Sequence, residues 1–176
     1  MGMVFTSLLD GMQYTPQAEE GALVEAGAVL ATLSGNAQAI LAGERVALNL
    51  LQRMCGIATL TRAYVDAVAG TDTTILDTRK TAPGLRALDK YAVLCGGGAN
   101  HRMRLDDGVM IKDNHIAVAG SIAQAVAQVR QATPMLTRIE VECDTLAQVE
   151  EALNTEVDVI LLDNMSLDDM RQAVSM

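Results

Sequence analysis

Beyond residue 71, the hydrophobic positions of the chain alternate between short apolar runs and segments with helical spacing. The apolar runs predict four strands, at 74–76, 109–111, 139–141 and 157–162. The helical spacing predicts a helix after each strand, at 85–95, 122–132, 146–153 and 167–174. Ser121 and Ser166 are expected N-caps, and Thr145 with Gln148 has the spacing of a capping box. Strands alternating with helices indicate a parallel sheet.

The first 70 residues follow a different pattern. Apolar alternation in 28–33, between glycines at 21, 27 and 35, predicts a short hairpin over 22–34. From Ala37 the period becomes helical, and one apolar face runs to Cys55. Gly56 is expected to interrupt this helix, and a second helical segment is expected over 57–70.

The fold class is therefore α/β, with about four βα units, which could form part of a (β/α) barrel. A complete barrel has eight units in roughly 250 residues, so four units are about half of one. Half a barrel exposes two sheet edges and an unfilled interior. Three interpretations stay open: a piece of a longer barrel, an open sheet, or a fold completed by association of chains.

Ionisable side chains follow all four predicted strands. In folds of this kind the chemistry lies where strands end and βα loops begin. The first two strand ends are cationic and the last two are anionic. In chain order they are Asp77-Thr78-Arg79-Lys80, Lys112-Asp113-Asn114-His115, Glu140 with Glu142, and Asp163-Asn164.

The cations are unevenly distributed along an acidic chain. The formal net charge is −9, yet residues 79–112 contain seven Lys and Arg, all three lysines included, against three aspartates. That stretch carries +4, so the rest of the chain carries −13. Such a local concentration favours a small, multiply anionic ligand, whereas nucleic acid would call for a broad basic face.

The remaining composition restricts the compartment. No apolar run reaches the roughly 18 residues of a membrane span, and the first residues lack the pattern of a secretory signal. The three cysteines, Cys55, Cys95 and Cys143, lack metal-site spacing. Free thiols of this kind are typical of the reducing cytoplasm, which is the expected location.

Several strings together resemble one enzyme family, the quinolinate phosphoribosyltransferases. The strings run in order from about residue 23 to residue 176. The most specific are Leu76-Asp77-Thr78-Arg79-Lys80-Thr81, Gly96-Gly97-Gly98-Ala99-Asn100-His101-Arg102 and Ile111-Lys112-Asp113-Asn114-His115. The resemblance implies two parts: 1–48, the end of an N-terminal α/β-sandwich domain, and 49–176, a partial (β/α)-barrel catalytic domain. It also implies a sequence incomplete at both ends.

Members of that family transfer a phosphoribosyl group from phosphoribosyl pyrophosphate to quinolinate, with Mg²⁺. Decarboxylation accompanies the transfer, and nicotinate mononucleotide, pyrophosphate and CO₂ are the products. The resemblance assigns quinolinate binding to Arg79, His101, Arg102 and Lys112. An arginine fork suits a planar carboxylate, and Lys and His add charge.

The resemblance assigns four further residues. Lys80 would reach a substrate phosphate or carboxylate, and Arg45 would enter the site of a second subunit, which implies a homodimer. Glu142 and Asp163 would lie near the ribose and Mg²⁺, where carboxylates stabilise an oxocarbenium-like centre. Glu140 is an alternative, since it lies two positions before Glu142 on the same strand face.

The other polar residues of this region have simpler interpretations. Arg86, Lys90 and Arg104 are expected to be helix or loop charges with only a general field effect, and His115 is expected to be structural. Gly96–Gly98 is expected to be a tight crossing that places His101 and Arg102, with a phosphate cradle as the alternative. Two competing functions stay open: a relative acting on another acidic heterocycle, and an inactive fragment or dimerisation remnant.

Overall fold

The structure is a computed structural model that describes residues 2–8 and 10–176. The chain divides into two compact units, Met1–Met103 and Arg104–Met176. The first holds α1 (Gly2–Thr6), β1 (Gln13–Pro16), β2 (Ala31–Ser34), α2 (Ala37–Ala67) and α3 (Arg86–Cys95). The second holds β3 (Val109–Ile111), α4 (Asp113–Ala119), α5 (Ile122–Ala132), β4 (Ile139–Cys143), α6 (Leu146–Leu153), β5 (Val159–Leu162) and α7 (Leu167–Ser175). This arrangement of helices and strands confirms the α/β class.

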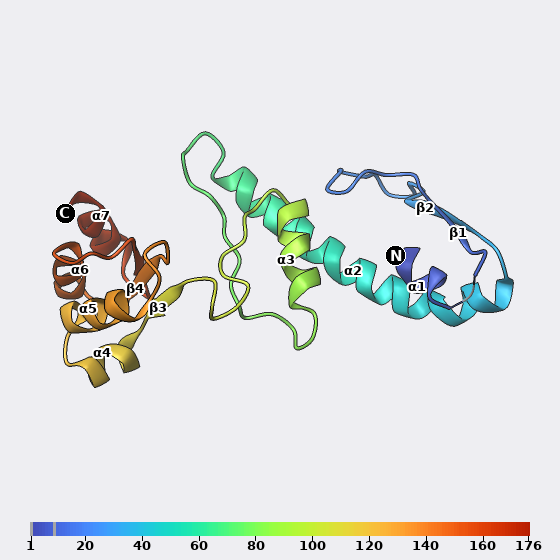
Figure 1. Cartoon of the computed structure of the whole chain (residues 1–176). Coiled ribbons are helices and arrows are strands. Elements are labelled where there is room, and N and C mark those ends of the chain that lie inside the picture. The colour runs from blue at the N-terminus through green and yellow to red at the C-terminus, as the bar shows by residue number, and fades with distance from the viewer. Residues whose placement is uncertain (1, 9) are drawn as a thin grey trace. The chain divides into compact units, whose positions relative to one another are not determined.

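The first unit is organised along one long helix, α2 (Figure 1). Asn36 caps it by accepting a hydrogen bond from the Ala39 amide at 3.1 Å. Helix α1 packs against its N-terminal half around Phe5, Met12 and Ala47, and α3 packs against its C-terminal half. The expected interruption at Gly56 is wrong, because the helix continues without a break to Ala67. A Cβ atom at Gly56 would meet nothing within 4 Å, so this glycine only lowers helix propensity.

The expected hairpin over 22–34 is also wrong. Only Ala31–Ser34 of that segment is a strand, and it pairs antiparallel with Gln13–Pro16. The two strands are joined by residues 17–30, which contain neither helix nor strand. Alternation located one strand correctly, but the partner lies outside the segment that the glycines delimit.

The expected strand at 74–76 is reduced to a single parallel bridge between Leu76 and Ala99. Two backbone hydrogen bonds hold it, from the Ala99 amide to the Ile75 carbonyl at 2.8 Å and from the Asp77 amide to the Ala99 carbonyl at 3.1 Å. The bridge lies just before Asp77-Thr78-Arg79-Lys80 on one side and before His101 on the other. It therefore brings two of the candidate segments side by side.

The second unit confirms the predicted strand–helix alternation. Its sheet is parallel in the order β3-β4-β5, and β4 lies between the other two. Ile139, Val141 and Cys143 of β4 are fully buried against α5 and α6. Ser121, Thr145 and Ser166 cap α5, α6 and α7 as predicted. Helix α4 was not predicted: it follows β3 directly, where a loop was expected.

The opposite face of β4 carries its two glutamates. Strand β4 extends to Cys143, two residues beyond the prediction, so Glu140 and Glu142 share one face as expected.

At the other end of the sheet, Arg130 donates to the Glu156 carbonyl and to Asp158, both at 2.6 Å. The Ile139 amide donates to Asp158 at 2.7 Å. These bonds fix the start of β4 and β5.

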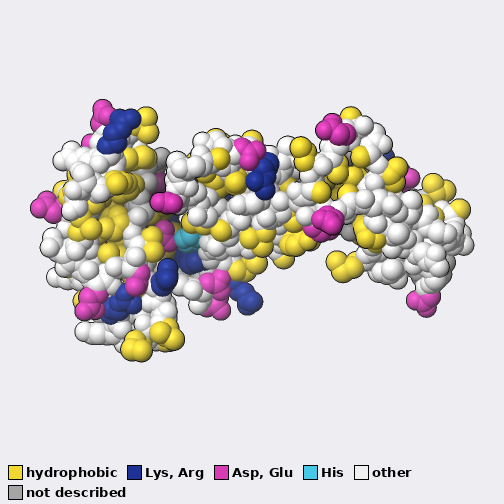
Figure 2. Space-filling model, turned by 90° about the horizontal axis from the view of Figure 1, so that it is seen from above, with side chains coloured by type: hydrophobic (Ala, Val, Ile, Leu, Met, Phe, Trp, Pro, Cys, Tyr) yellow, Lys and Arg dark blue, Asp and Glu magenta, His cyan; other side chains and the backbone are white. Residues whose placement is uncertain are grey.

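The surface is not uniformly polar. Figure 2 shows hydrophobic side chains spread among charged and neutral ones over the visible face. On α2, Leu41, Leu60 and Tyr64 are largely exposed. Among the helices of residues 2–8 and 10–176, none combines the length and apolar character that a membrane span requires.

Candidate functional site

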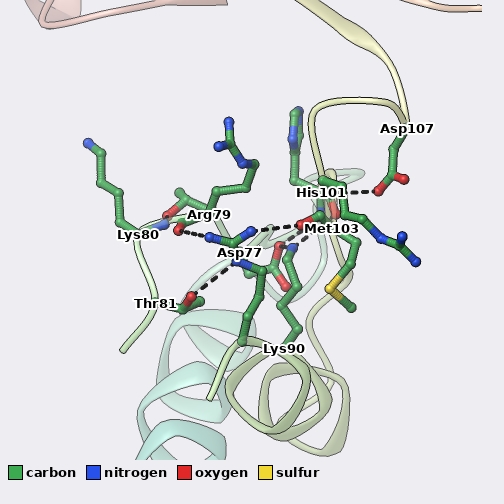
Figure 3. Close-up of polar contacts among 11 residues, drawn as sticks. Asp77, Arg79, Lys80, Thr81, Lys90, His101, Met103 and Asp107 are labelled. Carbon is green, nitrogen blue, oxygen red and sulfur yellow. Dashed lines mark hydrogen bonds and ion pairs between the residues drawn. The ribbon is translucent and has the colours of Figure 1, made fainter. Parts of the chain in front are cut away.

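The cationic candidates of the first unit come from the two segments that the Leu76–Ala99 bridge aligns. Arg79 and His101 are half-buried, while Lys80 is exposed. Figure 3 shows the side chains of Arg79, Lys80 and His101 on the side of Asp77 that faces away from α3. Arg102 follows His101 directly, and it is also half-buried. The structure thus places four predicted ligand-binding residues on neighbouring segments of one unit.

A buried ion pair lies beneath these segments. Lys90 of α3 pairs with Asp77, and their side chains are only 1% and 6% exposed. The Lys90 ammonium also donates to the His101 carbonyl at 2.9 Å, and the His101 amide donates to Asp77 at 2.8 Å. The expectation that Lys90 is an ordinary helix charge is wrong, because the side chain is buried and bonded to a candidate segment.

Asn100 completes the coordination of the Asp77 carboxylate. With its amide nitrogen turned toward these acceptors, Asn100 donates to Asp77 Oδ2 at 2.7 Å and to the Lys90 carbonyl at 3.0 Å. Both carboxylate oxygens of Asp77 are therefore bonded inside the unit. The Asp77 side chain is only 6% exposed, so it serves as a structural anchor.

Arg86 ties the same segments together from the start of α3. Its guanidinium donates to the Met103 carbonyl at 3.2 Å, to the Arg79 carbonyl at 3.4 Å and to Thr81 Oγ1 at 3.3 Å. The expectation of a general field effect is thus wrong for Arg86 as well. Sequence spacing gave no sign of these bonds, because all three partners lie in other segments.

Asp89 forms a further anchor between α3 and α2. It accepts two hydrogen bonds from Arg53, each at 2.7 Å, and a third from the Ala82 amide at 3.1 Å. The hydrogen bond with Arg53 holds the pKa of the Asp89 carboxyl below its ordinary value, despite the opposing effect of burial. The ionised Asp89 carboxylate thus fixes the loop between Lys80 and α3.

Gly96–Gly98 allow the chain to cross close to α2. A Cβ atom at Gly96 would lie 2.5 Å from the Ala58 carbonyl oxygen, and one at Gly98 would lie 3.0 Å from Thr61 Cγ2. Gly97 has φ +88°, which favours glycine. These contacts support the predicted tight crossing that leads the chain into His101.

The second unit places its candidates at the carboxyl ends of β3, β4 and β5. Lys112 follows β3, Glu142 lies on β4, and their side chains form an ion pair at 2.5 Å. Glu142 is 16% exposed and Lys112 44% exposed. Asp163 follows β5, and its amide donates to the Cys143 carbonyl at 2.9 Å. Since β4 and β5 are parallel neighbours, Glu142 and Asp163 come from adjacent strand ends.

Two neighbouring residues have structural roles here. His115 Nδ1 accepts the Lys112 amide at 2.9 Å, which caps the start of α4. This bond supports the structural interpretation of His115. Asn164 adopts φ 52°, a conformation that asparagine tolerates well, and donates to Asp163 at 2.9 Å. Arg104 is exposed, as expected of a loop charge.

Arg45 lies far from both groups along the chain, on α2. It is exposed and shares a helix face with exposed Leu41, four residues earlier. Among the described residues, no group of three or more His, Cys, Asp or Glu side chains forms a metal cluster. The expected boundary at 48/49 falls inside α2, and that division stays a prediction.

Two family models cover almost the whole sequence. The C-terminal domain of quinolinate phosphoribosyl transferase matches residues 57–176, and its N-terminal domain matches residues 3–55. The chain belongs to the quinolinate phosphoribosyl transferase family. The resemblance seen in the DTRKT, GGGANHR and IKDNH strings is thereby confirmed.

Individual family members agree closely in sequence. The chain is 51% identical over 173 residues to the probable nicotinate-nucleotide pyrophosphorylase [carboxylating] of Synechocystis, covering 98% of this chain and 59% of the relative. It is 51% identical over 156 residues to the nicotinate-nucleotide pyrophosphorylase [carboxylating] of Mycobacterium leprae, covering 89% and 55%. The chain thus spans less than two thirds of the length of these relatives.

Solved structures of the family agree with the fold. The nicotinate-nucleotide pyrophosphorylase of Ehrlichia chaffeensis matches with a TM-score of 0.93 at 44% identity. That from Francisella tularensis matches with a TM-score of 0.94 at 40% identity. Each match covers 99% of this chain and 63% or 62% of the other. The partial α/β fold predicted from the sequence is that of the quinolinate phosphoribosyl transferase family.

Proposed function

We propose that the chain acts in phosphoribosyl transfer from phosphoribosyl pyrophosphate to quinolinate, the reaction of NAD synthesis that releases pyrophosphate and CO₂. The observation that carries the proposal is that Arg79, His101 and the adjoining Arg102 are half-buried on backbone segments held by Arg86 and by the buried Asp77–Lys90 pair. A planar dicarboxylate is well matched by cations held at fixed positions, because little side-chain entropy is then lost on binding. The family to which the chain belongs supports the same substrate.

The proposal gives the cationic residues two roles. Arg79, His101, Arg102 and Lys112 hold the two carboxylates of quinolinate, and Lys80, which is exposed, reaches a phosphate or carboxylate of the substrates. Lys112 is already paired with Glu142. An ammonium group has three N–H donors, so Lys112 can keep Glu142 and still donate to a substrate carboxylate.

Glu142 and Asp163 are assigned to the ribosyl centre. When pyrophosphate departs, positive charge develops on the ribose, and nearby carboxylates stabilise it. Their origin from adjacent strand ends supports a joint role. Glu140 is nearly buried on the same strand face, so Glu142 is better placed for contact with a substrate.

Decarboxylation asks little more of the protein. Once the ring nitrogen is ribosylated, the electron pair of the breaking C–CO₂ bond is stabilised by the positively charged ring, and a proton then replaces the lost CO₂. The cations must hold the carboxylates without overstabilising the ground state.

Magnesium fits this site as a companion of the pyrophosphate substrate. Mg²⁺ prefers oxygen ligands and keeps substrate phosphates and waters, so one or two protein carboxylates are enough. Glu142 and Asp163 are such carboxylates, and the described residues contain no larger cluster. The ion would neutralise charge that develops on the departing pyrophosphate.

Assembly and location complete the proposal. We infer a homodimer or a larger homo-oligomer, because the Arg45 face of α2 also exposes Leu41, and Leu60 and Tyr64 lie exposed farther along α2. The three free cysteines support a reducing cytoplasmic location.

Calorimetric titration with quinolinate, beside nicotinate and with Mg²⁺, tests the proposal. We expect the wild-type chain to prefer quinolinate, and Arg102→Ala to weaken its binding roughly 10- to 100-fold, because a charge-assisted carboxylate contact is lost. Arg104→Ala is the matched control, since it removes an exposed arginine two positions away and should leave affinity within about twofold.

Two outcomes would contradict the proposal. Unchanged quinolinate affinity in Arg102→Ala would refute the carboxylate assignment. Quinolinate binding without formation of nicotinate mononucleotide from phosphoribosyl pyrophosphate would refute the transfer step and favour the inactive alternative.

A further inference from the structure

The Asp77–Lys90 pair is unusual in its burial. Its side chains are 6% and 1% exposed. Removing two charges from water is costly, and a buried ion pair is often no more stabilising than apolar residues of similar volume. Stability alone therefore does not explain why an ion pair is buried at this point. Its bonds to neighbouring backbone suggest a more specific role.

Both bonds to His101 act on its backbone, one at its amide and one at its carbonyl. The His101 amide, which donates to Asp77 at 2.8 Å, belongs to the peptide plane shared with Asn100. The His101 carbonyl, which accepts from Lys90 at 2.9 Å, belongs to the plane shared with Arg102. Peptide units are rigid, so fixing the two planes that flank one residue fixes its φ and ψ. The direction of its side chain is then restricted as well.

The pair does not itself face a ligand. Lys90 Nζ is almost completely buried and points at Asp77 and a carbonyl, and both oxygens of Asp77 are bonded inside the unit. Figure 3 shows Lys90 on the α3 side of Asp77, opposite the side chains of Arg79 and His101. Any effect of the pair on a bound anion therefore passes through the segment that it holds.

We propose that Asp77 and Lys90 are positioning residues that set the orientation of His101 and Arg102, and through them the preference for a dicarboxylate over a monocarboxylate. The part concerning the ligand rests on the proposed function. If these two cations are misoriented, binding of quinolinate, which needs contacts to two carboxylates, should weaken more than binding of a monocarboxylate, which needs contacts to one.

A double variant, Asp77→Asn with Lys90→Met, removes the bond between Lys90 and the His101 carbonyl without leaving an unpaired charge. Lys90→Met alone would leave a buried carboxylate unpaired and could prevent folding. In the double variant the new amide oxygen at position 77 can still accept from the His101 amide. The Asn100 side-chain amide can turn over, so that its oxygen accepts from the new amide nitrogen at position 77, but its bond to the Lys90 carbonyl is then lost. The double variant therefore removes two bonds, the one from Lys90 to the His101 carbonyl and the one from Asn100 to the Lys90 carbonyl.

Arg171→Met is the control for the double variant. It also replaces a cation by methionine, but the ion pair that it removes is an exposed one on α7. An exposed pair of this kind contributes little to stability, so the control should fold as the wild type does.

The chain contains two histidines, which makes imidazole NMR a direct readout. Without ligand, we expect the double variant to shift or broaden the His101 ring signals, while those of His115 in the other unit stay unchanged. By calorimetry, its quinolinate affinity should fall roughly tenfold and its nicotinate affinity much less, so that selectivity decreases. Arg171→Met should match the wild type in both measurements.

Three results would separate the two proposals. A folded double variant with wild-type His101 signals would overturn the positioning role. Altered His101 signals with unchanged selectivity would overturn the link from orientation to ligand preference. A wild-type chain that binds no quinolinate would overturn the proposed function, and the ligand-free His101 signals would still decide whether the pair positions this residue.

Discussion

Two glycine-to-alanine variants test the packing between α2 and the glycine crossing. In Gly96→Ala the new Cβ would lie 2.5 Å from the Ala58 carbonyl oxygen and 2.6 Å from Thr61 Cβ. Both atoms belong to α2 and cannot rotate away, so one of the two segments must shift. Gly56→Ala is the matched control, because its Cβ would meet nothing within 4 Å.

The expected free energies have opposite signs. Overpacking of this kind costs about 1–3 kcal/mol. Gly96 has φ −74°, so alanine also restricts the unfolded chain there and recovers about 0.5–1 kcal/mol. At mid-range values the net loss in Gly96→Ala is about 1.3 kcal/mol. Gly56→Ala should gain about 0.5–1 kcal/mol through helix propensity. The two variants should therefore differ by about 2 kcal/mol.

Tyrosine fluorescence can follow the unit concerned. The chain has no tryptophan, and its three tyrosines, Tyr14, Tyr64 and Tyr91, all lie in Met1–Met103. With a typical urea dependence of about 2 kcal/mol per M, the unfolding midpoints of the two variants should differ by about 1 M. Equal midpoints, or a lower midpoint for Gly56→Ala, would refute the close contact between the crossing and α2.

Two further predictions concern titratable groups. Asp89→Asn should destabilise the first unit by about 2 kcal/mol, because a nearly buried carboxylate that holds two segments is lost. The pKa of Asp89 in the folded chain lies below the ordinary 3.8. The difference in unfolding free energy between the wild type and Asp89→Asn should therefore be complete above about pH 5 and vanish as the pH falls through the folded pKa. Urea titrations at several pH values would show this. Burial raises the pKa of Cys143 to about 11. Cys143 should therefore resist alkylation in the native chain at about pH 8, while the exposed Cys55 reacts. Mass spectrometry that finds both cysteines labelled equally would contradict this prediction.

The elements predicted correctly from the sequence carry their signals locally. Helix α6 has an amphipathic repeat, and the Gln148 side chain accepts from the Thr145 amide at 3.1 Å, the capping box that the spacing indicated. Strand β4 is a short β-branched and apolar run beside glutamates, and it lies where the pattern placed it. Such signals involve neighbours within a few residues, so one sequence is enough to detect them.

The failures arise where a distant partner decides the structure. Strand β2 pairs with β1, from which residues 17–30 separate it, and no local pattern identifies that partner. Helix α4 is short and starts directly after β3, where the His115 side chain supplies the cap. The sequence predicts an ordinary helix charge at Lys90, because its burial depends on Asp77, 13 positions away. The sequence does contain one signal for the burial of Lys90: the residue lies in an amphipathic helix close to apolar positions that face the core.

The continuity of α2 has a consequence for how this sequence can change in length. Arg45 and Thr61 lie on one uninterrupted helix, at a separation of about 24 Å. Each inserted or deleted residue between them would turn Arg45 by about 100° and move it by about 1.5 Å relative to the glycine crossing. No small change in length restores both the angle and the distance. The helix between Arg45 and the crossing can therefore accept substitutions, whereas an insertion or deletion would displace Arg45 relative to the crossing.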